Sequence, residues 1–177
     1  SERGWSALKK VGVDKEVLKI AIPMHKRVMH DVEGNLTNQP YGNQGQAIYS
    51  VSRAQLNVLM MEIADKNGAK LYFDEKCVEA DLEDAIATFE NVKTGEKQGV
   101  LADLLIGADG SLSAVRGQMV KKHQHEYVYN EIKHDYKELL IPAGENSTHL
   151  LDKNALHIWP RGKFMLIALA NLDGSFT

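Results

Sequence analysis

The stretch Leu104-Leu105-Ile106-Gly107-Ala108-Asp109-Gly110-Ser111-Leu112-Ser113-Ala114-Val115-Arg116 decides the fold class of this chain. Residues 104–106 form an uninterrupted apolar run, which predicts a short buried strand. Gly107 and Gly110 favour a turn, and a helix is expected to begin near residues 111–113. Together, these elements place backbone N–H groups and the Asp109 carboxylate at the C-terminal edge of a sheet, where nucleotides bind in α/β proteins. The sequence therefore predicts an α/β fold with a candidate nucleotide site.

A simpler interpretation of the same turn stays open. Asp109 can cap the following helix by accepting hydrogen bonds from its first backbone N–H groups. In that case the turn is an ordinary strand–helix connection that needs no ligand, and the local pattern taken alone slightly favours this interpretation.

Composition narrows the class of protein. The 177 residues are 44% hydrophobic and 25% charged, as in ordinary globular domains, and the net charge of −3 argues against a nucleic-acid partner. The single cysteine, Cys77, excludes an internal disulfide framework and favours a reducing compartment. No run approaches the roughly 20 apolar residues of a membrane span, and no signal peptide is recognisable. We therefore expect a cytoplasmic protein whose present segment does not bind a membrane; membrane association through further sequence at the C-terminus stays open.

The termini suggest a longer protein. The chain opens at Ser1 without a start methionine, and residues 171–177 resemble the beginning of another strand. No G-x-G-x-x-G occurs, although a dinucleotide site needs one after its first strand. We therefore expect a fragment that lacks a glycine-rich strand–helix unit at one end and further sequence at the other.

Hydrophobic periodicity and turn residues predict the order of the elements. Two short helices are expected first, followed by a hairpin that turns at Gly34, a strand, and a helix that Ser52 and Gln55 begin with a capping box. The apolar stripe of that helix, from Leu56 to Ala64, is expected to be core. The ranges are 6–11 and 15–20 for the short helices, and 24–32, 36–41, 47–51, 70–73, 76–80, 85–91, 99–102, 127–141, 154–161 and 164–169 for strand-like segments.

The hairpin brings an arginine towards a tyrosine. A turn centred near Gly34 places Arg27 opposite Tyr41 or one position away, with Cβ atoms of directly opposed residues about 5 Å apart. A guanidinium beside a phenol is a plausible carboxylate receptor, because Arg offers a fork of donors and Tyr adds another. The alternative is a solvated Arg27 beside a packed Tyr41, and a register slip would separate the two.

Arg53 falls in the first turn of a predicted helix, where the helix dipole disfavours a cation by about 0.3–1 kcal/mol. Either Arg53 is solvated at a small cost, or it belongs to a binding site for an anionic ligand. His123 and His125 lack a third ligand nearby, so no metal site is predicted. We find no nucleophile–base motif, and any chemistry must therefore come from a cofactor.

The motif D-G-x-x-S-x-x-R after L-I-G, formed by Asp109, Gly110, Ser113 and Arg116, resembles the second fingerprint of the FAD-dependent aromatic hydroxylases. The segment Arg53-x-x-Leu56-x-x-x-Met60 is similar to the one whose arginine contacts FAD in that family. The resemblance implies FAD and NADPH as cofactors. It also implies cofactor-binding roles for Arg53, Cys77, Asp109, Gly110 and Arg116, with Cys77 near the adenosine end of FAD. From its residue type alone, Cys77 is expected to pack as a small apolar side chain.

Further segments resemble the branch of this family that hydroxylates L-kynurenine. They are R-V-M-H at 27–30, Q-P-Y-G at 39–42, L-H-I-W-P-R at 156–161 and A-L-A-N-L-D-G-S-F-T at 168–177; Ala170 departs from the proline of many members. The resemblance implies hydroxylation of L-kynurenine ortho to its aniline nitrogen, with NADPH and O₂. It implies that Arg27 and Tyr41 hold the substrate carboxylate and that Ile48, Leu156 and Ile167 line the aromatic pocket.

The resemblance also implies a domain division. Residues 1–23 and 52–120 would belong to the Rossmann-like FAD/NAD(P)-binding domain, and residues 24–51 and 121–177 to a mixed or antiparallel substrate-binding sheet. Without the glycine-rich motif, the chain alone is expected neither to hold FAD nor to turn over. Two other functions stay open: hydroxylation of a different aromatic acid, and a non-catalytic α/β binding module. The sequence predicts no oligomeric state.

Overall fold

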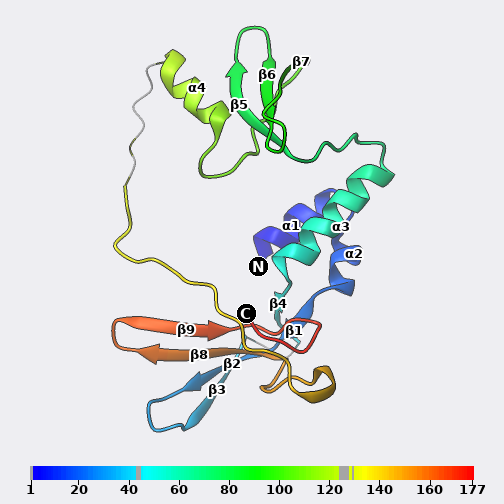
Figure 1. Ribbon diagram of the computed structural model, residues 1–177. Helices are drawn as coiled ribbons and strands as arrows, with labels where there is room; N and C mark the ends of the chain where they lie inside the picture. The colour runs from blue at the N-terminus through cyan, green and yellow to red at the C-terminus, as the bar shows by residue number, and fades with distance from the viewer. Residues whose placement is uncertain (1, 43–44, 124–127, 129) are drawn as a thin grey trace. The chain divides into compact units, whose positions relative to one another are not determined.

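The computed structural model describes residues 2–42, 45–123, 128 and 130–177, and has the predicted α/β character (Figure 1). Its contacts divide the chain into two compact units. Unit 1 combines residues 1–69 with 136–177, and unit 2 comprises residues 70–135. This division follows packing and does not coincide with the domain division expected from the resemblance, which stays a prediction.

Unit 1 contains a mixed sheet of four strands in the order β3-β2-β8-β9. The predicted hairpin is present as β2 (Lys26–His30) and β3 (Leu36–Pro40), paired antiparallel. Its turn is held by Asp31, whose carboxylate accepts hydrogen bonds from the backbone N–H and the side-chain amide of Asn35 at 2.7 and 2.8 Å. Strand β8 (Ala155–Arg161) runs parallel to β2 and antiparallel to β9 (Phe164–Ala168).

The register assigns the side chains of this sheet to two faces. Leu156 pairs with Arg27, and Ile158 pairs with both Met29 and Ile167, so these side chains share what we call the front face. The rear face carries Val28, His30, His157, Trp159 and Ala168. The predicted alternation in β8, with Leu156 and Ile158 on one face and His157 and Trp159 on the other, is therefore confirmed.

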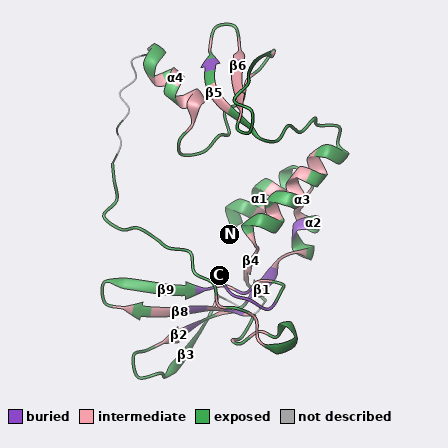
Figure 2. Cartoon of the chain, in the orientation of Figure 1, coloured by how far each residue is buried: buried purple, intermediate pink, exposed green. Residues whose placement is uncertain are grey.

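The core of unit 1 lies behind this sheet. A second, two-stranded sheet pairs β1 (Ile22–Met24) with β4 (Ile48–Ser50), and the Ser50 hydroxyl donates to the Ala170 carbonyl at 2.8 Å. Ile22, Ala168, Ala170 and Phe176 form the buried cluster. Figure 2 shows burial along β1, β2 and β8, whereas β9 is largely exposed. On β2 the front-face residue Arg27 is exposed, whereas the rear-face residue Val28 is buried.

Three helices complete unit 1: α1 (Glu2–Lys10), α2 (Asp14–Lys19) and α3 (Arg53–Lys66). Ser52 caps α3 as predicted, because its hydroxyl accepts from the Gln55 N–H at 3.4 Å, and Gly68 at φ +86° ends the helix. The apolar stripe of α3 is half-buried and not core as expected, since none of its residues is fully covered by the described chain. A single turn of 3₁₀-helix, η1 (Glu145–Ser147), precedes β8.

Unit 2 is an antiparallel meander followed by a helix. Its strands are β5 (Glu75–Asp81), β6 (Ile86–Asn91) and β7 (Lys97–Leu101), close to the predicted ranges, and α4 (Ala114–His123) contacts β5. The Asn91 side chain accepts from the N–H groups of Lys93 and Thr94, which shapes the predicted turn between β6 and β7.

Three predicted strands are wrong in the described chain. Residues 104–106 are extended but unpaired, with Leu104 and Ile106 74% and 77% exposed. Residues 70–73 and the described part of 127–141 also lack strand structure apart from one bridge at Ile141; Tyr127 and Tyr129 lie outside the described residues. A strand requires a hydrogen-bonding neighbour, and within the described residues none pairs with these segments. None of the described helices is long and apolar enough to cross a bilayer.

Candidate functional site

The guanidinium carbon of Arg27 lies 4.4 Å from the centroid of the Tyr41 ring. The expected contact is therefore confirmed, but by a different register. Arg27 pairs with Gln39, two positions before Tyr41, because the Asp31–Asn35 turn centres on Glu33 and not on Gly34. The backbone N–H of Tyr41 continues the ladder by donating to the His25 carbonyl at 2.9 Å. A two-residue offset keeps both side chains on the front face, where diagonal neighbours still reach one another.

Tyr41 holds a buried hydroxyl that has no hydrogen-bond partner among the described residues. Arg27 is exposed, and no carboxylate of the described chain pairs with its guanidinium. A buried, unpartnered hydroxyl costs about 1–3 kcal/mol, and such groups normally find an acceptor. Within the described part of the chain the donor has no acceptor and the cation no counter-ion, and this arrangement fits the oxygen atoms of an anionic ligand.

The front face also carries the predicted pocket residues Leu156 and Ile167. Leu156 is the direct neighbour of Arg27 across the parallel β2–β8 pair. Ile167 lies on the same face in the next row, opposite Ile158 and in line with Met29, and its exposed fraction of 48% adds apolar surface to that face. Ile48 belongs to the separate β1–β4 sheet, where it pairs with Met24, and the four-stranded register does not join it to this group.

The rear face holds a polar cluster that the sequence analysis missed. His157 is buried, and its Nε2 lies 3.0 Å from the Asp152 carbonyl, which can only accept; His157 Nδ1 is then the acceptor for His30 Nε2–H at 2.9 Å. His30 stacks on Trp159 at 4.1 Å between ring centroids. Arg161 donates to the carbonyls of His30 and Asp31, both at 3.0 Å. The sequence did contain a signal for this cluster, because the alternation of β8 places His157 and Trp159 on the same face.

In unit 2, Asp109 caps α4, as the simpler interpretation of its turn proposed. Its two oxygens accept from the Ser113 hydroxyl at 2.5 Å and the Ala114 N–H at 2.7 Å. The Ser113 hydrogen bond is the main reason that the pKa of Asp109 lies below its ordinary value. The Asp109 carboxylate can accept a further hydrogen bond while it caps the helix, because its two oxygens offer about four lone-pair sites.

Gly110 and Arg116 shape the same turn. Gly110 adopts φ +81°, and no atom lies within 4 Å of the place where a Cβ would stand, so the turn is open on that side. Arg116 folds back on the turn and donates to the Gly110 carbonyl at 3.3 Å and to the Ser111 carbonyl. Gly107, predicted from the sequence only as a turn residue, lets the chain approach α4: a Cβ there would lie 3.0 Å from that of Val115.

Cys77 on β5 and Asp109 are both predicted cofactor residues of unit 2, and the charge of Asp109 acts on the pKa of the Cys77 thiol. Burial, and then the Asp109 charge, raises the pKa of the thiol. Cys77 is half-buried, and its thiol lies 3.5 Å from the Glu79 carbonyl. It therefore has the character of a protonated packing residue and not of a nucleophile.

Arg53 at the start of α3 is exposed, and Glu138 of the same chain forms an ion pair with it. Its side chain is 74% exposed, and the pKa of Arg53 is raised by a hydrogen bond with Tyr136 and then by Glu138. A contact of Arg53 with a cofactor stays a prediction.

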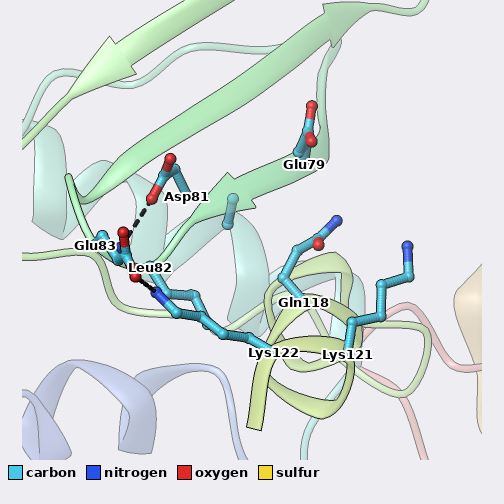
Figure 3. A pocket seen from close by; sticks show the side chains of 8 residues that line it. Glu79, Asp81, Leu82, Glu83, Gln118, Lys121 and Lys122 are labelled. Atoms are coloured by element: carbon cyan, nitrogen blue, oxygen red, sulfur yellow. Dashed lines mark hydrogen bonds and ion pairs between the residues drawn. The ribbon is translucent and has the colours of Figure 1, made fainter. Parts of the chain in front are cut away.

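A pocket of about 410 Å³ lies between the end of β5 and α4 in unit 2 (Figure 3). Lys122 pairs with Glu83 at 2.6 Å at its edge, and Asp81 accepts from the Glu83 N–H at 2.8 Å. None of the predicted site residues lines it. Among the described residues no group of three or more His, Cys, Asp or Glu side chains could hold a metal; His125 and the side chain of His123 lie outside them.

Comparison with known proteins identifies the class. A family model described as an FAD binding domain matches residues 1–143, so the chain belongs to the family of FAD-binding domains. A variant of HpxO from Klebsiella pneumoniae, solved in complex with FAD, aligns with a TM-score of 0.65 at 16% identity, covering 98% of this chain and 44% of that one. The fold is accordingly the α/β fold of FAD-binding aromatic hydroxylases.

The curated relatives narrow the class further, because they carry the name kynurenine 3-monooxygenase. The relative from Flavobacterium johnsoniae is 47% identical over 177 residues, and that from Dictyostelium discoideum 44% over 179 residues. The Anopheles gambiae relative is 40% identical over 179 residues. Each match covers 100% of this chain but only 37–40% of the relative. The chain thus spans about 40% of the length of the curated relatives it matches.

Proposed function

We propose that the full-length protein carrying this segment is a flavin-dependent monooxygenase that hydroxylates L-kynurenine with NADPH and O₂. The observation that carries the proposal is the pair of Arg27 and Tyr41, which we call the carboxylate clamp. Among the described residues no carboxylate pairs with its cation, and none accepts from its buried hydroxyl.

The clamp suits one end of an aromatic amino acid. The Tyr41 hydroxyl would donate to one carboxylate oxygen, and the Arg27 guanidinium would neutralise the charge. Leu156 and Ile167 offer apolar surface on the same face for an aromatic ring. A substrate held at both ends is oriented for reaction, and orientation is the main contribution the protein makes when the aniline itself activates the ring.

The turn of unit 2 fits part of a flavin nucleotide. Asp109 keeps accepting capacity for a ribose hydroxyl, and the open side of Gly110 leaves room for the nucleotide to approach. Cys77 would lie near the adenosine end, while Arg53 and Arg116 would contact FAD after leaving Glu138 and the turn carbonyls. When bound, FAD supplies the redox chemistry, accepting electrons from NADPH and activating O₂. We retain residues 1–23 and 52–120 as the proposed FAD domain, and residues 24–51 and 121–177 as the substrate sheet.

The test is NADPH oxidation by the full-length protein against a panel of aromatic acids, with product analysis. We expect L-kynurenine to stimulate oxidation and to yield the ring-hydroxylated product. Stimulation by a different aromatic acid, with no hydroxylation of L-kynurenine, would reassign the substrate. No flavin in the full-length protein would remove the proposed chemistry altogether.

A further inference from the structure

Gln39 is the direct cross-strand neighbour of Arg27, and the carboxylate clamp does not use it. Both residues are exposed and lie on the front face. Directly opposed residues have Cβ atoms about 5 Å apart, so the Gln39 amide and the Arg27 guanidinium can reach two neighbouring groups of one ligand.

The carboxylate clamp and the apolar side chains of the front face do not provide a partner for the α-ammonium group of a bound amino acid. Arg27 is a pure donor, and the Tyr41 hydroxyl is used as a donor to the carboxylate. Around them the face is apolar at Met29, Leu156, Ile158 and Ile167. An α-amino acid also carries an ammonium group, which needs an acceptor. The amide oxygen of Gln39 is a strong acceptor next to the clamp.

We propose that Gln39 is a specificity-determining residue whose side-chain oxygen accepts a hydrogen bond from the α-ammonium group of the substrate, which Arg27 and Tyr41 hold by its carboxylate. The carboxylate and the ammonium group sit on the same carbon, so their protein partners must be neighbours, as Gln39 and Arg27 are. This role rests on the proposed function and adds selection for amino acids over simple aromatic acids.

An uncharged acceptor suits this position better than a carboxylate does. A glutamate at position 39 would stand opposite the Arg27 guanidinium and form an ion pair with it, removing Arg27 from the substrate carboxylate. An amide leaves the guanidinium available and still accepts from the ammonium group.

The experiment compares two substrates in the full-length flavoprotein. One is L-kynurenine, and the other is its desamino analogue, which keeps the carboxylate and the aryl ketone but has hydrogen in place of the ammonium group. In Gln39→Met the side chain keeps its length but loses the acceptor. We expect kcat/KM for L-kynurenine to fall by roughly 10- to 100-fold and that for the analogue to change less than about twofold. Gln39→Glu should lower kcat/KM for both.

Thr37→Val is the matched control, because Thr37 lies on the same face two residues earlier and pairs with Met29. It should leave both substrates unchanged, and flavin content and melting temperature should match the wild type in all variants. Equal losses for both substrates in Gln39→Met, or no loss for L-kynurenine, would overturn the role of Gln39. A wild-type flavoprotein that hydroxylates neither substrate would overturn the proposed function, and this role with it.

Discussion

His30 and His157 meet at 2.9 Å between Nε2 and Nδ1 on the rear face of the sheet whose front face carries Arg27 and Leu156. The hydrogen bond joins the two parallel strands β2 and β8 on which the proposed site is built. Its direction follows from the Asp152 carbonyl, which requires a proton on His157 Nε2 and leaves Nδ1 to accept.

This pair makes stability depend on pH. Burial, followed by the charges of His157 and Arg161, lowers the pKa of His30, so the folded state disfavours its protonated form. Above about pH 6.5 His30 is neutral in both folded and unfolded chains, and its contribution to stability is fully present. As the pH falls below that value, His30 takes up a proton in the unfolded chain before it does so in the folded chain. The free energy of unfolding therefore decreases until the pH reaches the lowered pKa of His30 in the folded state.

We therefore expect the unfolding midpoint in urea to decrease between pH 7.5 and pH 5.5, and to decrease less in His30→Gln. The carboxyls of Asp31 and Asp152 do not contribute to the pH dependence between pH 7.5 and pH 5.5. Their pKa values are lowered from 3.8, so their effects on stability fall at more acidic pH. A histidine titration by NMR in which His30 shows an ordinary or raised pKa would contradict the prediction.

Tyr41→Phe separates ligand binding from stability. Removing a buried hydroxyl without a described partner should leave the free energy of unfolding unchanged or raise it by about 1 kcal/mol. In the full-length protein the same change should raise KM for L-kynurenine by roughly tenfold, because a hydrogen bond to the substrate carboxylate is lost. Chemical denaturation and steady-state kinetics measure the two effects. A clear loss of stability would mean that the hydroxyl has a protein partner.

Asp109 can be tested for its two roles with two variants. Asp109→Ala removes the hydrogen bonds of Asp109 with the Ser113 hydroxyl and the Ala114 N–H, while the Ser113 hydroxyl still accepts from the Arg116 N–H, and should lower the stability of unit 2 by about 0.5–2 kcal/mol. Asp109→Asn should retain most of that stability, because asparagine caps helices as well as aspartate does. In the full-length protein, FAD affinity should fall in both variants if the charge contacts the cofactor. If Asp109→Asn retains FAD affinity, the negative charge of Asp109 does not contact the cofactor. Asp109 then acts only through a side-chain oxygen that asparagine also has, or only by capping α4.

Gly107 and Gly117 should respond oppositely to the same substitution. Gly107→Ala places a methyl group 3.0 Å from the Val115 Cβ and should destabilise unit 2 by forcing the turn away from α4. Gly117 lies within α4 with open space around it, so Gly117→Ala should stabilise by about 0.5–1 kcal/mol. Thermal unfolding followed by circular dichroism compares them. Equal effects would contradict the close packing of turn and helix.

The sequence was informative where structure is local. The Ser52 cap and the two hairpin turns depend on residues a few positions apart, and their side chains satisfy backbone groups within the same turn. The sequence could not place residues 104–106, because an apolar run becomes a strand only when another strand supplies hydrogen bonds, and no described strand does so here. The Arg27–Tyr41 contact was predicted from a register that proved to be wrong. The contact is nevertheless present, because Arg27 pairs with Gln39, and a shift of two residues keeps Tyr41 on the same face as Arg27.

By its own pattern the sequence determined the periodic elements, their caps and turns, and the motif that indicates an FAD-binding family. Only the tertiary structure decided which residues stand beside Arg27, since β8 joins β2 across more than a hundred residues of chain. Short-range patterns record the conformational preference of each segment. Neighbours brought together by long-range pairing, such as Leu156 beside Arg27 and His157 against His30, are selected by burial and hydrogen bonding in the folded sheet.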